Sequence, residues 1–147
     1  MNASALTAVV VDTDVYTLLF VRRDSPDPRV PGWRQRLVGR RVFATFQTRA
    51  ELLALASTNA WGERRATALR AQLDRTATIG VDESVVEAYA TLVAECRRTG
   101  HALHQKHHTG DRWVAACAMA KGADLLAGDR IFAGAPGLRL LGGDDHV

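Results

Sequence analysis

The stretch Ala8-Val9-Val10-Val11-Asp12-Thr13-Asp14 decides the fold that we predict for this chain. Its four apolar residues, three of them β-branched, predict a short strand that is buried on both faces, as in the centre of a parallel sheet. Two carboxylates, Asp12 and Asp14, follow the strand, and a helical pattern begins at once. Ligands of open α/β sheets bind at this end of the strands. We therefore expect a ligand here, and carboxylate oxygens favour a divalent metal.

Predicted strands and helices alternate along the rest of the chain. The first strand covers residues 6–12, and the others are expected at 41–46, 76–81, 124–128 and 138–141. Helices are expected at 14–22, 33–39, 48–58, 61–76, 82–99 and 111–121, with a proline-rich loop at 24–32 and a polar, histidine-rich connection at 101–110. This alternation predicts an α/β/α sandwich around a short, mostly parallel central sheet.

Composition and length favour a single soluble domain. The 147 residues are 47% hydrophobic, and we expect one domain over residues 1–147 with a loose tail at 142–147. A net charge of +3 permits a phosphate-rich partner without requiring one. Cys96 and Cys117 lie on apolar helix faces and are predicted to be buried free thiols. We find no signal peptide, and no segment approaches the roughly 20 apolar residues of a membrane span, so a cytoplasmic protein is expected.

Four acidic residues occupy matching places in this predicted architecture. Asp12 ends the first strand, Glu51 lies in the first turn of the helix at 48–58, Asp111 opens the alanine-rich helix, and Asp129 follows the fourth strand. All four are expected at the carboxyl edge of the sheet, where their mutual repulsion favours binding of a cation. Oxygen-only ligands select Mg²⁺ or Mn²⁺, which can activate water for attack on a phosphodiester.

Each of these acids also has a structural interpretation. Thr48 and Glu51 have the spacing of a capping box, in which the glutamate satisfies a backbone N–H. Asp111 would be favourable in a first helical turn by its charge alone. Asp129 lies in a common turn sequence, and Asp14 is a plausible N-cap. The shared position of the acids at one edge is what favours a functional interpretation.

Four sequence motifs, in this order, resemble those of the PIN domain, and more narrowly those of VapC-type toxins of bacterial toxin–antitoxin pairs. The motifs are Val-Val-Val-Asp-Thr-Asp at 9–14, Thr-Arg-Ala-Glu-Leu at 48–52, Asp-Arg-Trp-Val-Ala-Ala-Cys-Ala at 111–118 and Asp-Leu-Leu-Ala-Gly-Asp-Arg-Ile-Phe at 124–132. Ala127 departs from the family pattern, which often has Thr or Ser there, and Ile131 replaces a common further acid. Asp14 could compensate with an additional carboxylate.

The resemblance implies a fold, an activity and a set of partners. The fold is an α/β/α sandwich, and the activity is an Mg²⁺- or Mn²⁺-dependent endoribonuclease with Asp12, Glu51, Asp111 and Asp129 as catalytic metal ligands. A homodimer and a cognate antitoxin are implied as well. The antitoxin would place a basic side chain among the acids and displace the metal.

Basic residues and histidines close to the acids are further candidates. Arg49, Lys106, Arg112 and Arg130 lie next to the acids in sequence and are predicted to contact RNA phosphate. His101, His104 and His108 could hold zinc if their segment were helical, although no cysteine pair accompanies them. The cluster of arginines at 64, 65, 70 and 75 is interpreted as a solvated helix face.

Two other functions are compatible with parts of the sequence. Asp12 and Asp14 have the Asp-x-Asp spacing of haloacid-dehalogenase-like phosphatases, but Tyr16 and the residues that follow Asp129 lack further marks of that family. A PIN-like module without catalysis could bind a protein or RNA, although the presence of all four acids is unfavourable to it. No helix–turn–helix that would indicate a transcriptional regulator is found.

Overall fold

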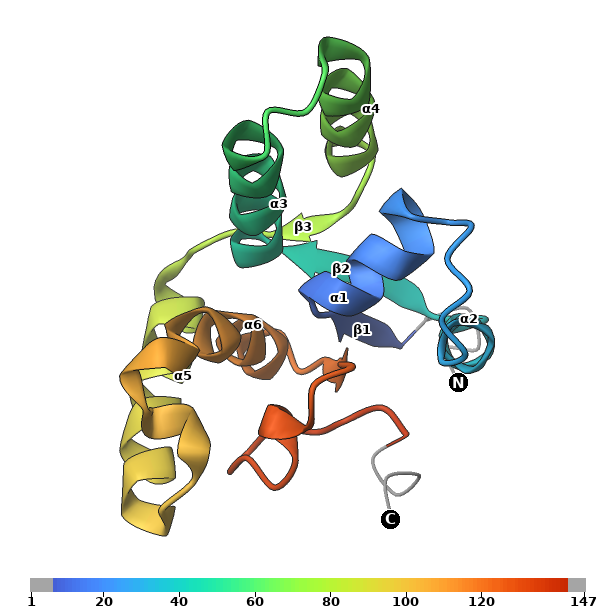
Figure 1. The fold of residues 1–147 in the computed structure, drawn as a ribbon. Helices are drawn as coiled ribbons and strands as arrows, with labels where there is room; N and C mark the ends of the chain where they lie inside the picture. Colours follow the sequence, from blue (N-terminus) through green and yellow to red (C-terminus); the bar gives the residue numbers. More distant parts are fainter. Residues whose placement is uncertain (1–6, 143–147) are drawn as a thin grey trace.

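The computed structural model describes residues 7–142 and arranges them in three layers, with a sheet between two groups of helices (Figure 1). Within these residues the sheet has four strands in the order β3-β2-β1-β4, and every pairing between neighbouring strands is parallel. The strands are β1 (Ala8–Val11), β2 (Arg41–Thr45), β3 (Thr78–Ile79) and β4 (Asp124–Leu126). The predicted α/β/α sandwich with a mostly parallel sheet is therefore confirmed.

Strand β1 lies where the strand order changes direction, because β2 and β3 lie on one side of it and β4 on the other. Val9 and Val11 face one hydrophobic cluster and Val10 faces the other, as the two-residue period of a strand requires. All three valines are fully buried. The end of β1, where Asp12 follows, is thus a topological switch point, the usual place for a ligand in this fold class.

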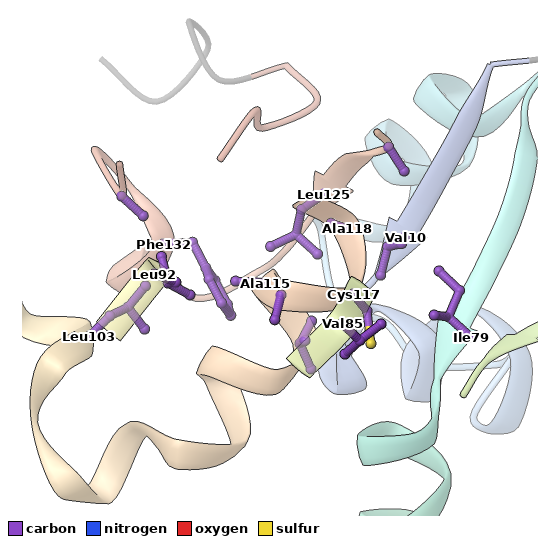
Figure 2. Close-up of a cluster of buried hydrophobic side chains, with 14 of the residues drawn as sticks. Val10, Ile79, Val85, Leu92, Leu103, Ala115, Cys117, Ala118, Leu125 and Phe132 are labelled. Atoms are coloured by element: carbon purple, nitrogen blue, oxygen red, sulfur yellow. The ribbon is translucent and has the colours of Figure 1, made fainter. Parts of the chain in front are cut away.

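The two faces of the sheet are covered by different helices. α5 and α6 pack on the Val10 face, whereas α1 to α4 pack on the face of Val9 and Val11 (Figure 1). Figure 2 shows the first of these clusters, in which α6 contributes the small residues Ala115 and Ala118 and can therefore lie close to the strands. The helices are α1 (Thr13–Tyr16), α2 (Val30–Leu37), α3 (Phe46–Thr58), α4 (Glu63–Asp74), α5 (Glu83–Thr99) and α6 (Thr109–Ala120).

Several predicted element boundaries are wrong. The expected strand at 138–141 makes only one parallel bridge, from Leu140 to Leu125, because turns with positive φ at Gly134 and Gly137 leave little extended chain before it. The helix expected at 14–22 is helical in α1 but continues as a π-helical turn, η1 (Thr17–Val21). α2 begins before the predicted residue 33, since a proline is favourable in its first turn.

The cysteine and arginine predictions are confirmed. Cys96 and Cys117 are buried free thiols, and burial raises the pKa of Cys117 to about 12, so this thiol stays protonated. The arginine face of α4 is exposed, and one of its residues, Arg65, lies 3.6 Å over the ring of Trp61. No helix within residues 7–142 has the length and apolar character needed to cross a membrane. The predicted loose tail, 142–147, lies almost entirely outside the described residues.

Candidate active site

A pocket of about 590 Å³ opens at the carboxyl edge of the sheet, and acidic side chains from four separate segments line it. The four acids predicted from the sequence all lie on this pocket, together with Asp14. They are Asp12, Glu51, Asp111 and Asp129. Thr13, Thr17, Arg22 and several apolar residues complete the wall. The structure therefore brings together residues that are up to 117 positions apart in the chain, from 12 to 129.

Asp12 is the buried member of this group, with 5% of its surface exposed. It is the N-cap of α1, since its Oδ1 accepts a hydrogen bond of 3.1 Å from the backbone N–H of Val15. The N-cap interpretation of Asp14 is wrong, because that residue lies exposed in the first turn of the helix. Burial, and then the adjacent carboxyl group of Asp14, raise the pKa of Asp12 well above its ordinary value. Its ionised form is therefore unfavourable unless a cation is close.

Glu51 is free of the capping role that its spacing suggested. The N-cap of α3 is Thr45, the last residue of β2, whose side chain accepts from the backbone N–H of Thr48 at 3.2 Å. β2 runs into α3 without a loop, so the helix begins before Thr48 and Glu51 falls beyond the capping positions. Its exposed carboxylate accepts a hydrogen bond of 2.9 Å from Gln47 Nε2 and lines the pocket. The capping-box interpretation is wrong.

Asp111 and Asp129 each make a local contact and also line the pocket. Asp111 lies in the first turn of α6, with its Oδ2 2.9 Å from Nδ1 of His108. Asp129 Oδ1 accepts from the backbone N–H of Ile131 at 2.9 Å and caps a short 3₁₀ turn, as its turn sequence indicated. The structural interpretations of these two residues hold, and they do not compete with a role in the pocket because a carboxylate has further acceptor sites.

Hydrogen bonds between threonines, which the sequence analysis did not predict, connect the elements around the pocket. Thr13 Oγ1 lies 2.8 Å from Thr48 Oγ1, which joins α1 to α3. Thr17 Oγ1 donates to the carbonyl oxygen of Thr13 at 2.7 Å. These contacts fix the segment of Asp12 against the helix that carries Glu51. Thr13 and Thr48 are 35 positions apart, and no local pattern signals their pairing.

The carboxylates fit a hard divalent cation by chemistry. Every candidate ligand is an oxygen, which selects Mg²⁺ or Mn²⁺ over softer metals. No three histidine, cysteine or acidic side chains within residues 7–142 are grouped closely enough to coordinate one ion directly. Mg²⁺ keeps several of its waters and takes one or two carboxylates directly, so a looser ring of acids satisfies its requirements.

The structure contradicts the predicted phosphate contact of Arg112. This side chain is 7% exposed, does not line the acidic pocket, and gives its N–H groups to protein oxygens. α6 begins at Thr109, earlier than predicted, and directs Arg112 inward beneath residues 102–108. Of the other basic candidates, Arg49 forms an ion pair with Asp74 at 2.8 Å, whereas Lys106 and Arg130 are exposed.

The histidine segment does not form a zinc site. His101 Nδ1 accepts from the backbone N–H of Leu103 at 3.1 Å, and its Nε2 lies 2.8 Å from the carbonyl oxygen of Ala133. Both ring nitrogens are thus used within the fold. His108 contacts Asp111 instead, and its neighbours belong to two 3₁₀ turns rather than one helix. Within residues 7–142 these histidines are not grouped with one another or with acids or cysteines as three ligands of one ion.

Comparison with known proteins gives concordant matches. The family model of the PIN domain matches residues 9–138. The chain is 30% identical over 132 residues to Ribonuclease VapC4 of Mycobacterium tuberculosis, covering 90% of this chain and 94% of that protein. VapBC2 from Rickettsia felis, solved bound to a DNA fragment from its promoter, is similar in fold, with a TM-score of 0.72 at 19% identity over 91% of this chain and 97% of the other. DNA-bound VapBC from Salmonella typhimurium gives a TM-score of 0.70 at 20% identity, with 92% and 97% covered.

Proposed function

The chain belongs to the PIN domain family, and on that premise we propose that it is a VapC-type endoribonuclease toxin that hydrolyses RNA phosphodiester bonds with Mg²⁺ or Mn²⁺. One observation carries the proposal: five carboxylates from four segments line a single pocket at the switch point of a parallel sheet. Acids so arranged repel one another, and the fold tolerates this arrangement best when a cation occupies the pocket.

We assign the binding of that cation to Asp12, Glu51, Asp111 and Asp129. A divalent ion held there supplies a water of lowered pKa and neutralises charge on the phosphate oxygens. The residues of the chain hold the metal ligands and the substrate in position. Buried Asp12 is fixed by the backbone of α1, and the contact of His108 with the Asp111 carboxylate orients that side chain. The Thr13–Thr48 contact keeps α1 and α3 together, so that an RNA phosphate and an attacking water can be held in line.

The same family membership supports proposals about partners. The solved structures that resemble this chain include toxin–antitoxin proteins, and we propose a cognate antitoxin that inserts a basic side chain among the acids. Inhibition by such a partner would weaken as the Mg²⁺ concentration rises, because both compete for the carboxylates. We further propose a homodimer, action on RNA in the cytoplasm, and one PIN-like domain over residues 1–147, of which 9–138 match the family model.

The alternative functions have less support. The phosphatase suggested by Asp12 and Asp14 belongs to another family than the one matched, and Asp12 is a buried N-cap rather than an exposed nucleophile. A non-catalytic binding module would have no need of five carboxylates around one pocket. Metal binding, measured by calorimetry, separates such a module from the nuclease.

Cleavage of total RNA by antitoxin-free protein tests the proposed function. We expect discrete fragments with Mg²⁺ and none with a chelator. Asp111→Asn should lower the rate by about 100-fold or more, since even groups that only orient metal ligands contribute about 10- to 100-fold. Glu87→Gln, an exposed acid on α5, serves as the matched control and should cut as the wild type does. Intact RNA in every condition, or chelator-resistant cleavage, would contradict the proposal.

A further inference from the structure

A second cavity, of about 540 Å³, lies directly beside the acidic pocket. The two share Asp129, which lines both. Three arginines line the second cavity, Arg29, Arg36 and Arg130, whereas the acidic pocket has one, Arg22. The Trp33 side chain also contributes to its wall. A cationic cavity next to a ring of carboxylates is suited to a ligand that carries negative charge on a repeating backbone.

Arg29 is held in place by two anchors. Asp27 accepts from Nε at 3.1 Å and from Nη2 at 2.9 Å, so that one edge of the guanidinium is engaged in a two-point ion pair. The guanidinium also lies 4.8 Å over the ring of Trp33, which is itself buried. The remaining nitrogen, Nη1, is 3.5 Å from the carbonyl oxygen of Gly128 on the strand-to-turn segment that carries Asp129. A side chain so fixed is prepared for a bound anion at low entropic cost.

Gly128 explains how this arginine approaches the acids. A Cβ at this position would lie 2.6 Å from Asp14 Oδ2, 3.0 Å from Arg29 Nη1 and 3.2 Å from Trp33 Cζ2. The carboxylate of Asp14 and the guanidinium of Arg29 therefore both approach Gly128, and a side chain at this position would displace them from where they lie. The two cavities adjoin at Asp129, with most of the carboxylates in one, the negative half of the site, and three arginines in the other, the positive half.

We propose that the positive half, with Arg29 as its fixed anchor, binds a phosphate that flanks the cleaved bond of an RNA strand. The proposal rests on the function proposed above, in which the acids and their cation take the cleaved phosphate. The adjacent phosphate of the strand then reaches the arginines, and Arg29 sets the register of the RNA. Arg29 is a positioning residue, because it acts on the flanking phosphate and leaves the reacting atoms to the acids.

The test compares wild type with Arg29→Gln on a short RNA that contains a cleavage site mapped on total RNA. A second set of RNAs carries one neutral methylphosphonate at a single linkage on either side of the cleaved bond. We expect Arg29→Gln to raise KM about tenfold or more, as for loss of a charge-assisted hydrogen bond, with little change in kcat. On the RNA in which a methylphosphonate replaces the phosphate contacted by Arg29, the wild type and Arg29→Gln should have the same KM.

Three comparisons keep the result interpretable. Mn²⁺ binding by Arg29→Gln, measured by calorimetry, should be at least as tight as in the wild type, because every acid is kept and a positive charge close to Asp14 and Asp12 is removed. Asp27→Asn should give a smaller rise in KM by releasing the guanidinium. Arg98→Gln, an exposed arginine that is likewise paired with a carboxylate, is the matched control and should leave KM unchanged.

The outcomes separate this inference from the proposed function. If the wild type cuts no RNA, the function itself fails. If it cuts RNA and Arg29→Gln cuts equally well, the flanking subsite is overturned. The subsite is also overturned if the rise in KM for Arg29→Gln persists on every methylphosphonate RNA. It is likewise overturned if the variant only weakens binding of an antitoxin, since the cavity would then bind a protein partner.

Discussion

Asp12→Asn is expected to abolish metal-dependent RNA cleavage and at the same time to make the metal-free protein more stable at neutral pH. The loss of cleavage should be at least about 100-fold, since the substitution removes the most buried carboxylate of the proposed metal site. The gain in stability has a separate cause. Asparagine keeps an acceptor for the backbone N–H of Val15 and introduces no charge beside Asp14.

The direction of the stability change follows from the pKa of Asp12. Burial, followed by the hydrogen bond and charge of Asp14, raises this pKa in the folded state above its value in the unfolded chain. The contribution of Asp12 to stability is therefore fully present below the unfolded-state pKa of about 3.9 and is lost as pH rises through the folded-state value. The asparagine side chain of the variant does not titrate, so the advantage of the variant should grow across that pH range.

Thermal unfolding in chelator, from acidic to neutral pH, measures this difference. Mg²⁺ should raise the stability of the wild type by about 2.7 kcal/mol at about 100 times its Kd and leave the variant unchanged. Asp82→Asn is the matched control, for which we expect the change in stability to have the opposite sign. Asp82 also caps a helix, but it is exposed, and the Lys121 ammonium lowers its pKa, so its loss should destabilise the protein at neutral pH. An Asp12→Asn protein that is less stable than the wild type throughout would refute the electrostatic argument.

The sequence was sufficient for the fold wherever a local pattern was strong. The run of valines predicted the central strand, and the alternation of strands and helices predicted the parallel sheet. The errors fall where tertiary contacts decide. Residues 138–141 have the composition of a strand, but the turns before them allow only one bridge to β4. The predicted start of α3 was wrong because the N-cap is Thr45, at the end of a strand, and Thr48 lies within the helix.

The candidate site was predictable only in part, because local patterns place the acids but not the contacts that support them. Acids placed after strands, or close to the starts of helices, are brought to the carboxyl edge of a parallel sheet, and all four line the pocket there, although Glu51 lies in the second turn of its helix rather than the first. The contacts that support them join residues distant in sequence and leave no periodic signal. Arg29 reaches Gly128 across 99 positions, out of a loop whose prolines indicated only irregular structure. Proximity in sequence misled in the case of Arg112, which follows a site acid and yet faces the core.

Arg112→Met is expected to destabilise the protein by about 3 kcal/mol, or about 10 °C in Tm, with little effect on RNA cleavage per folded molecule. The guanidinium donates from Nη1 to the carbonyl oxygens of Leu103 and Gln105, both at 2.6 Å, and contacts two hydroxyl groups. It therefore connects the segment before α6 to α5 and α6. Methionine fills similar space but leaves the carbonyl oxygens without a donor.

Unfolding and cleavage measured together distinguish this structural role from the phosphate contact suggested by the sequence. Arg112→Lys retains the charge with a single nitrogen, so it should recover only part of the lost stability, whereas a phosphate-binding role would be largely preserved by lysine. Arg98→Met, on the exposed face of α5, should change neither quantity. A variant that unfolds at the wild-type temperature but cuts RNA poorly would indicate that Arg112 contacts the RNA substrate. If stability alone falls, Arg112 is a structural residue, whose hydrogen bonds join the first turn of α6 to the segment before it and to α5.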